Sequence, residues 1–394
     1  MTNREIIELN QRYLFPTYQR APLALVRGEG CRVWDADGKE YLDFFSSTVV
    51  TTLGHAHPRL TAAIAEQAAR ILHVSNLHHS EPQAILAEKL CRNSFADRVF
   101  LCNSGAEANE AAIKLARKYG ADHGDGRYEI LTATGSFHGR TIATITATAQ
   151  EKVRHGFQPL PEGFRYFPFD DIDALAAAVS SRTIAIMVEP IQGEGGIATP
   201  DKGYLAAVRR LCDERGLLLI LDEVQTGIGR TGKLFAYEHS EIRPDIITLA
   251  KGLGSGVPIG AMLATEALAS SFGLGTHGST FGGNALCCAA ANAVLDVLLE
   301  DGVLANCLEQ GEYLRSKLSE LQSRSPSIQE IRGAGLLVGV ALDRPGASIV
   351  EACREAGLLI NCTAERVLRL TPPLIVRSAE VDAALAILER ALAS

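Results

Sequence analysis

The feature that most constrains the fold is a series of short, unbroken apolar runs that alternate with helix-like stretches through the middle of the chain. A strand covered by helices on both faces gives a continuous apolar run, whereas a half-exposed strand alternates apolar and polar residues. Strands that alternate with helices build a mainly parallel sheet. We therefore predict an α/β fold whose large domain contains a mainly parallel, seven-stranded sheet. The expected strands lie at residues 99–102, 129–134, 165–168, 184–189, 217–222, 246–250 and 260–264.

The two ends of the chain carry a different pattern, which predicts a second, smaller α+β domain. Asp37-Gly38 supplies a hairpin turn between two short apolar stretches, and a helix is expected to close the chain near residues 379–392. Further strands are expected at 31–34, 41–44, 335–341, 358–361 and 367–370. We place the large domain at residues 50–285 and build the small domain from residues 1–49 and 286–394.

Charge and composition exclude several classes of function. The chain has 394 residues and a formal net charge of −8, and no Lys/Arg-rich run offers a local site for nucleic acid. No apolar run approaches the ~20 residues that a membrane span needs, and the charged N-terminus lacks the apolar core of a secretory signal. The nine cysteines are odd in number and include no CxxC pair, which is typical of reduced thiols in a cytoplasmic protein. His55, His57, His78 and His79 lack a third ligand at metal-site spacing, so we expect no metal.

Residues 227–233, with the sequence GIGRTGK, match two nucleotide-binding motifs in part. They fit the spacing of the dinucleotide fingerprint GxGxxG and most of a P-loop. A P-loop needs Ser or Thr after its lysine and precedes the acidic strand, whereas here Leu234 takes that place and the motif follows the strand. The dinucleotide fingerprint opens a helix directly from a strand, yet residues 222–226 intervene. We expect an irregular loop, and a nucleotide-dependent enzyme is the weaker alternative.

Two of the predicted strands end in a residue that can carry chemistry. Asp222 follows the apolar run 217–221, at the carboxyl end of a strand, where α/β folds bind ligands. A buried carboxylate needs a cationic or hydrogen-bonding partner, and a pyridinium nitrogen would be one. Lys251 follows the strand at 246–250 and precedes a glycine-rich stretch, where a lysine with a depressed pKa can act as a Schiff-base nucleophile. Taken alone, Asp222 also suits a structural ion pair and Lys251 an exposed position.

Two further stretches suit the binding of a flat, phosphorylated cofactor. Ser104 and the glutamate three residues later have the spacing of a capping box, which leaves the amides of Gly105 and Ala106 at a helix N-terminus. Such amides form a natural anion site. Phe137 offers an aromatic face, and Arg140 offers a guanidinium that can grip a carboxylate through two parallel hydrogen bonds. Each of these features is common by itself, so only their combination points to one chemistry.

Together, these stretches resemble the class-III pyridoxal-phosphate-dependent aminotransferases, and most of all the members of that family that act on acetylornithine. The resemblance runs from about residue 15 to the C-terminus, and it implies the fold type I PLP-transferase architecture and a homodimer with shared active sites. Six motifs in the family order carry it: NSGAEANE (103–110), FHGR (137–140), EPIQGEGG (189–196), LDEVQTG (221–227), LAKGLG (249–254) and HGSTFGGN (277–284).

The resemblance implies which residues bind pyridoxal 5'-phosphate. Lys251 would form a Schiff base with the cofactor and then move the proton between the substrate carbon and the cofactor. Asp222 would pair with the pyridine nitrogen. The remaining implied contacts are Ser104, Gly105 and Ala106 at the phosphate, Phe137 and Val224 on the ring faces, Gln225 at the ring hydroxyl, and Thr280 from the second subunit.

The resemblance also implies how the substrates are held. Arg140 would bind the α-carboxylate of the amino donor, and Tyr18 would be a further substrate contact. Glu194 would neutralise Arg369 while the donor is bound and release it to hold a carboxylate of 2-oxoglutarate. A purely structural Glu194–Arg369 ion pair is the alternative. Tyr18 does not exclude ornithine, because ornithine aminotransferases also carry a tyrosine there. Thr48 stands where those enzymes have a bulky aromatic residue, and it leaves room for an acyl group.

The expected reaction is a ping-pong transfer of the δ-amino group of N2-acetyl-L-ornithine to 2-oxoglutarate in arginine biosynthesis. Its products would be N-acetyl-L-glutamate 5-semialdehyde and L-glutamate. Ornithine, succinylornithine and 4-aminobutyrate stay open as amino donors. The alternative from a different class of function is a non-catalytic scaffold with this fold. Such a scaffold would need none of Lys251, Asp222 and Arg140.

Overall fold

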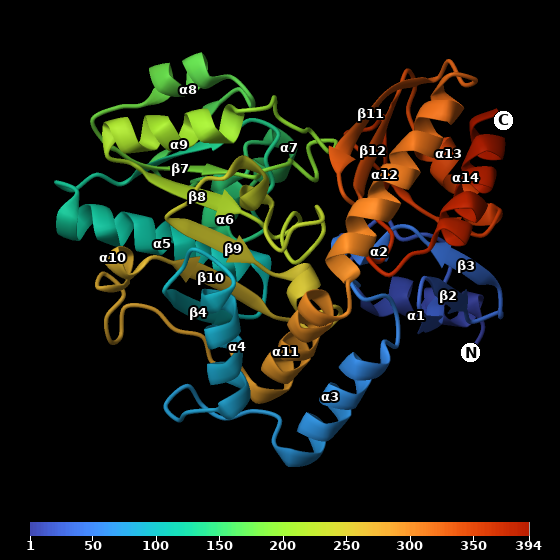
Figure 1. Ribbon diagram of the computed structural model, residues 1–394, viewed down its shortest axis with the longest axis horizontal. Helices are drawn as coiled ribbons and strands as arrows, with labels where there is room; N and C mark the ends of the chain where they lie inside the picture. The colour runs from blue at the N-terminus through green and yellow to red at the C-terminus, as the bar shows by residue number, and fades with distance from the viewer. Residues whose placement is uncertain (394) are drawn as a thin grey trace.

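The seven strands predicted for the middle of the chain form one sheet in the computed structural model, which describes residues 1–393 (Figure 1). Six strands run in the same direction, while β10 runs antiparallel to both of its neighbours, β4 and β9. The α/β fold with a mainly parallel sheet is therefore confirmed. The spatial order of the strands is β4 (Arg98–Cys102), β10 (Gly260–Ala264), β9 (Ile246–Leu249), β8 (Leu218–Asp222), β7 (Thr183–Val188), β5 (Glu129–Ala133) and β6 (Phe164–Phe167).

Both faces of this sheet are buried, which explains the unbroken apolar runs. Alternate residues of β7 point to opposite faces. Ile186 and Val188 belong to a core cluster that also contains Val208 of helix α9 (Tyr204–Arg215). Met187 belongs to a second cluster, which contains Ile113 of helix α5 (Gly105–His123). Helices therefore cover the sheet on both sides.

Two four-stranded sheets lie outside the central one. The first has the order β1 (Leu25–Glu29), β2 (Arg32–Asp35), β3 (Glu40–Asp43) and β13 (Leu358–Leu359). Because β13 pairs with β3, for example Leu358 with Leu42, this sheet joins the two ends of the chain. The second has the order β11 (Ile328–Ala334), β12 (Leu337–Leu342), β15 (Val367–Leu370) and β14 (Asn361–Thr363). The domain boundaries near residues 50 and 285 stay a prediction.

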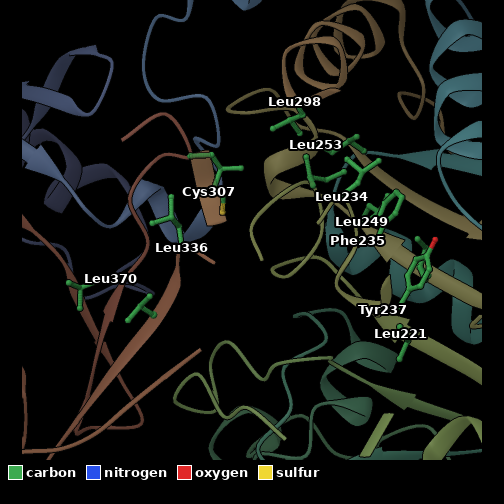
Figure 2. Packing of buried hydrophobic residues seen from close by; sticks show 14 of the residues in the cluster. Leu221, Leu234, Phe235, Tyr237, Leu249, Leu253, Leu298, Cys307, Leu336 and Leu370 are labelled. Carbon is green, nitrogen blue, oxygen red and sulfur yellow. The ribbon is translucent and has the colours of Figure 1, made fainter. Parts of the chain in front are cut away.

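One hydrophobic cluster connects the central sheet with the C-terminal part. Figure 2 shows members from both sides, with Leu221 and Leu249 in the central sheet and Cys307, Leu336 and Leu370 in the C-terminal part.

Within residues 1–393, no helix is long and apolar enough to cross a membrane. The other helices are α1 (Asn3–Tyr13), α2 (Ser46–Val49), α3 (Pro58–Arg70), α4 (Glu81–Arg92), α6 (Ile142–Ala147), α7 (Glu151–Arg154), α8 (Ile172–Ala178), η1 (Ala236–Ser240), η2 (Lys251–Leu253), α10 (Glu266–Ala269), α11 (Ala285–Glu300), α12 (Val303–Gln322), α13 (Ala347–Glu355) and α14 (Ser378–Ala393).

Candidate active site

The candidate site is a cavity of about 400 Å³ at the carboxyl ends of the central parallel strands. Because β8 and β9 are parallel neighbours, their ends meet at one edge of the sheet and bring Asp222 and Lys251 to the same cavity. The volume lies in the usual range for a small-molecule site. Nine of the residues proposed from the sequence line this cavity: Ser104, Gly105, Ala106, Phe137, Arg140, Asp222, Val224, Gln225 and Lys251.

Lys251 is the amine of this cavity. It follows β9 at the start of the 3-10 helix η2, with a backbone φ of +43°. This left-handed conformation costs a non-glycine residue about 1–2 kcal/mol, and such strain concentrates at functional sites. Its side chain reaches the cavity wall, but protein surrounds the ammonium group. Burial therefore lowers the pKa of Lys251 to about 8, although the charge of Glu194 opposes the shift. A substantial fraction of the amine is neutral near pH 8.

Asp222 is held rigidly by three neighbours at the end of β8. Its Oδ2 atom accepts a hydrogen bond from Nδ2 of Asn109 at 2.7 Å and lies 2.7 Å from Nδ1 of His138. Its Oδ1 atom accepts from the backbone amide of Val224 at 3.0 Å. Asn109 is itself oriented, because the hydroxyl of Thr248 donates to its Oδ1 atom at 2.6 Å. Asp222 and His138 are almost completely buried, so the carboxylate depends on these donors.

Glu189 is a second buried carboxyl group in the cavity wall, for which no role was predicted from the sequence. It follows β7 directly and accepts hydrogen bonds from the backbone amides of Phe137 at 2.9 Å and Gly193 at 3.1 Å. Burial raises the pKa of Glu189 to about 7. The charge of nearby His138 lowers that pKa, whereas Asp222 raises it further. The site thus combines two buried carboxyl groups with one imidazole.

The helix N-terminus predicted from the capping pattern borders the cavity. Ser104 is the N-cap of α5, and its Oγ atom accepts from the backbone amide of Glu107 at 3.2 Å. In a capping box, the Glu107 carboxylate would accept from the backbone amide of Ser104, but here it has other donors. The Glu107 carboxylate accepts from the amide of Asn103 at 2.8 Å and from the Ser104 hydroxyl at 3.1 Å. First-turn amides such as those of Gly105 and Ala106 have no partner within the helix, so they can face an anion.

Phe137 and Arg140 both line the cavity, and they contact each other. The guanidinium carbon of Arg140 lies 5.3 Å from the centre of the Phe137 ring, in the range of a cation–π interaction. Arg140 is otherwise exposed, so its donors face the open side of the cavity. The pair can therefore present an aromatic face and a guanidinium to one ligand.

Glu194 and Arg369 form an ion pair beside this cavity. Nη1 of Arg369 lies 2.6 Å from Oε1 of Glu194 and 3.3 Å from Oε1 of Gln225, a residue of the cavity wall. Nε2 of Gln225 in turn donates to Oε1 of Glu194 at 3.2 Å. Burial tends to raise the pKa of Glu194, but the charge of Arg369 outweighs it and lowers the pKa below its usual value. Both groups are therefore charged.

Two residues proposed from the sequence stand apart from the cavity in a single chain. Tyr18 is 74% exposed in the N-terminal segment, and Thr280 is exposed in the loop that precedes α11. Neither contributes to the cavity wall formed by the described part of this chain. Thr280 was expected to reach the site of a second subunit, which does not require it to face its own cavity.

The comparison with known proteins decides the family. Residues 14–392 match the aminotransferase class-III family. A relative from Caldanaerobacter subterraneus, named acetylornithine aminotransferase, is 54% identical over 391 residues, which cover 98% of this chain and 99% of the relative. The chain is a class-III aminotransferase.

Solved structures agree with this assignment. An ornithine aminotransferase from Toxoplasma gondii, with PLP at partial occupancy in its active site, is 35% identical and superposes with a TM-score of 0.96. That similarity covers 100% of this chain and 94% of the other. An acetylornithine aminotransferase from Elizabethkingia anophelis is 33% identical, with a TM-score of 0.89 and coverage of 100% and 99%. The fold type I PLP-transferase architecture of this aminotransferase is therefore established.

A class-III aminotransferase uses pyridoxal 5'-phosphate, and the cavity fits that cofactor. It contains a partly neutral lysine amine, a buried carboxylate and a helix N-terminus, which match the carbonyl, the pyridine nitrogen and the phosphate respectively. Gly105 allows the start of α5 to approach Val224 closely, since a Cβ atom there would lie 2.9 Å from Cγ1 of Val224. Asn109, His138 and Glu189 also line the cavity; all three lie in the quoted motifs, but no role was predicted for them.

Proposed function

We propose that this aminotransferase moves the δ-amino group of N2-acetyl-L-ornithine to 2-oxoglutarate, giving N-acetyl-L-glutamate 5-semialdehyde and L-glutamate. The observation that carries the proposal is the charged Glu194–Arg369 pair, which contacts Gln225 of the cavity wall that also contains Lys251. While Arg369 is paired with Glu194, the site can accept the uncharged acyl end of the amino donor. Once Arg369 is released from Glu194, it can bind a carboxylate of 2-oxoglutarate. Relatives named acetylornithine aminotransferase, 54% and 49% identical over nearly the whole chain, support the same donor.

The chemistry proposed for Lys251 follows from its buried, partly neutral amine. The neutral Nζ atom would attach the cofactor and later carry a proton between the substrate carbon that bears the amino group and the cofactor. Bound pyridoxal phosphate supplies an electron sink for the charge that develops at that carbon. Asp222 would keep the pyridine nitrogen protonated, and His138 with Asn109 would hold Asp222 in place.

The other cofactor contacts are proposed from their positions around the cavity. Ser104 and the amides of Gly105 and Ala106 would bind the phosphate, which the N-terminal end of α5 also attracts. Phe137 and Val224 would contact the ring faces, and the amide of Gln225 would contact the ring hydroxyl.

We also infer that the enzyme is a homodimer, because Thr280 would complete the phosphate site of a second subunit. The loop that carries Thr280 supports this, since Leu274 and Phe281 are strongly exposed on it. Exposed apolar side chains that gather on one loop are typical of an interaction surface. The compartment proposed is the cytoplasm, and all nine cysteines, most of them buried, are unpaired.

For the amino donor, we propose that Arg140 holds the α-carboxylate at the open side of the cavity. Glu194 would neutralise Arg369 while the donor is bound. Thr48, a small residue in the segment before Val50 of the cavity wall, would leave room for the acetyl group. Tyr18 would reach the substrate from the N-terminal segment. When 2-oxoglutarate binds, Glu194 would release Arg369 to pair with its carboxylate.

Ornithine is the second candidate donor, because the solved structure with a TM-score of 0.96 is an ornithine aminotransferase. The test is to measure kcat/KM for N-acetylornithine, succinylornithine, ornithine and 4-aminobutyrate with 2-oxoglutarate as the common acceptor. The proposal expects kcat/KM for N-acetylornithine to exceed that for ornithine and 4-aminobutyrate by about 100-fold, the scale on which a pocket discriminates between ligands that differ by a small group. A higher value for ornithine would overturn the donor assignment and leave the family unchanged.

A further inference from the structure

Arg230 is a fully buried arginine in the loop that the sequence analysis compared with nucleotide-binding motifs. The loop is irregular, as predicted, and it connects Asp222 at the end of β8 with η1. The Arg230 side chain is only 1% exposed and is among the largest fully buried side chains of the molecule. Burying a guanidinium is costly, so its contacts need a physical explanation.

The guanidinium of Arg230 binds two backbone carbonyl groups of the C-terminal part. Its Nη1 atom donates to the carbonyl of Leu336 at 3.1 Å and to the carbonyl of Pro372 at 2.6 Å. Leu336 belongs to the turn between β11 and β12, and Pro372 follows β15. The backbone amide of Leu336 also donates to the carbonyl of Arg230 at 3.1 Å. One side chain therefore ties the loop to two separate segments.

Within the described residues this guanidinium has no carboxylate in direct contact, although the charge of Asp43 favours its protonated form. Among residues 1–393, no acidic oxygen forms an ion pair with Arg230, and neither its Nε nor its Nη2 atom has a hydrogen-bond partner in the protein. Burial lowers the pKa of Arg230 to about 10. Burying a guanidinium without an adjacent carboxylate costs desolvation free energy, and the two carbonyl hydrogen bonds are the direct interactions that offset this cost.

The loop and the turn pack so closely that there is no room for a side chain between them. Gly335 has φ +53°, and a Cβ atom there would lie 2.7 Å from the carbonyl oxygen of Arg230 and 2.6 Å from the carbonyl carbon of Thr231. On the other side of the turn, a Cβ atom on Gly311 of α12 would lie 2.3 Å from the carbonyl oxygen of Gly335. The backbones of the loop, the turn and α12 thus pack directly against one another.

The two tied segments carry two contacts of the active site. Gln225 precedes Arg230 by five residues in the same loop, and Arg369 of β15 precedes Pro372 by three residues. Gln225 and Arg369 meet at 3.3 Å. We propose that Arg230 is a positioning residue, which fixes where Arg369 stands relative to Gln225 and so sets the binding of the 2-oxoglutarate carboxylate. This inference rests on the proposed role of Arg369.

The test compares the two half-reactions of the variants Arg230→Met and Arg230→Lys in the PLP-loaded enzyme. Methionine removes the carbonyl bonds and the unpaired charge, whereas lysine keeps a charge with a different reach. A displacement near 1 Å can cost about 100-fold, so we expect Arg230→Met to lower kcat/KM for 2-oxoglutarate by at least tenfold, mostly through KM. The half-reaction with N-acetylornithine should stay within about twofold of wild type. A general loss of stability would lower the melting temperature and affect both half-reactions alike, because the variant leaves the carbonyls of Leu336 and Pro372 without this donor.

The variant Arg315→Met is the matched control. Arg315 donates to the carbonyl of Gly335 at 3.0 Å, on the same turn, but it makes no bond to the segment that follows β15. It should therefore leave the ratio of the two half-reactions unchanged. Wild-type kinetics for 2-oxoglutarate in Arg230→Met, or an equal loss in both half-reactions, would overturn the inference. If Arg230→Met does not fold, the same comparison in Arg230→Lys decides the matter.

A failure of the proposed donor would show itself separately. A wild-type enzyme that does not react with N-acetylornithine contradicts the proposed function, whatever the Arg230 variants do. In that case the amino-donor half-reaction is measured with whichever of ornithine, succinylornithine or 4-aminobutyrate reacts, and the selective effect on 2-oxoglutarate remains the test of Arg230.

Discussion

Glu194 and Arg369 form an ion pair of 2.6 Å whose arginine is only 1% exposed, whereas the glutamate side chain is 30% exposed. The asymmetry matters because the glutamate can turn toward solvent, while the arginine stays in place. Arg369 has a second bond to Gln225, and its Nε atom donates to Oδ1 of Asn361 at 3.0 Å. The arginine is thus held by three neighbours, and releasing one of them still leaves it oriented.

Replacing Glu194 with glutamine should impair the two half-reactions unequally. The variant keeps the shape of the side chain but leaves the Arg369 charge unneutralised beside the uncharged acyl end of the donor. We expect the rate constant for the N-acetylornithine half-reaction to fall by about tenfold, equivalent to about 1.4 kcal/mol. The glutamate half-reaction should change by less than about threefold, which single-turnover absorbance measurements would show. Equal losses in both half-reactions would contradict the release of Arg369 by Glu194 and would favour a purely structural ion pair.

The pKa of Lys251 predicts how the apoprotein takes up its cofactor. Only the neutral amine reacts, and burial lowers the pKa of Lys251 from its ordinary value to about 8. The rate of PLP uptake should therefore rise with pH and level off just above pH 8. A lysine with an ordinary pKa near 10.4 would give a rate that still rises through pH 10. Stopped-flow absorbance after mixing apoprotein and PLP at a series of pH values distinguishes the two.

His138→Ala should weaken cofactor binding through Asp222. The variant removes the imidazole that lies 2.7 Å from the carboxylate and leaves a buried oxygen with one donor fewer. Losing such a partner costs about 1–3 kcal/mol, so the dissociation constant for PLP should rise by roughly 5- to 150-fold. His138→Gln, which keeps a donor, is the matched control and should recover part of the loss. An unchanged dissociation constant in His138→Ala would show that Asp222 does not need this neighbour.

Mixed dimers test whether Thr280 acts on the partner's site. Lys251→Ala should lose transamination by at least ~1,000-fold, and Thr280→Asp should repel the phosphate with its added carboxylate. If Thr280 serves the other subunit, a hybrid of the two variants has one site with both changes and one intact site. Refolding the inactive variants together should then restore activity. Mixtures that remain as inactive as the separate variants would place Thr280 in its own subunit's site.

The central fold could be read from the sequence because its strands are buried on both faces. All seven apolar runs became strands, and the edge shared by β8 and β9 explains why two distant residues, Asp222 and Lys251, meet. The antiparallel direction of β10 was not foreseen, since an apolar run carries no sign of direction. Strand β11 was missed because its burial pattern neither alternates nor stays apolar.

The missed site residues differ in how visible they were. Glu189 ends the apolar run of β7 in the same way that Asp222 ends that of β8, so the same rule could have found it. Asn109 is a polar residue on the buried, alanine-rich face of α5, which is a signal for a specific partner. The contact of His138 with Asp222 and the carbonyl bonds of Arg230 join residues far apart in the chain, and no local pattern indicates such contacts.

The most direct test of the central claim is the visible spectrum of the PLP-loaded enzyme during addition of N-acetylornithine without any keto acid. The account predicts a yellow protein that bleaches as the amino group moves onto the cofactor, and colour that returns when 2-oxoglutarate is added. Bleaching with ornithine or 4-aminobutyrate but not with N-acetylornithine would contradict the proposed donor. A protein that stays colourless after incubation with PLP would contradict the assignment of Lys251 and the account built on it.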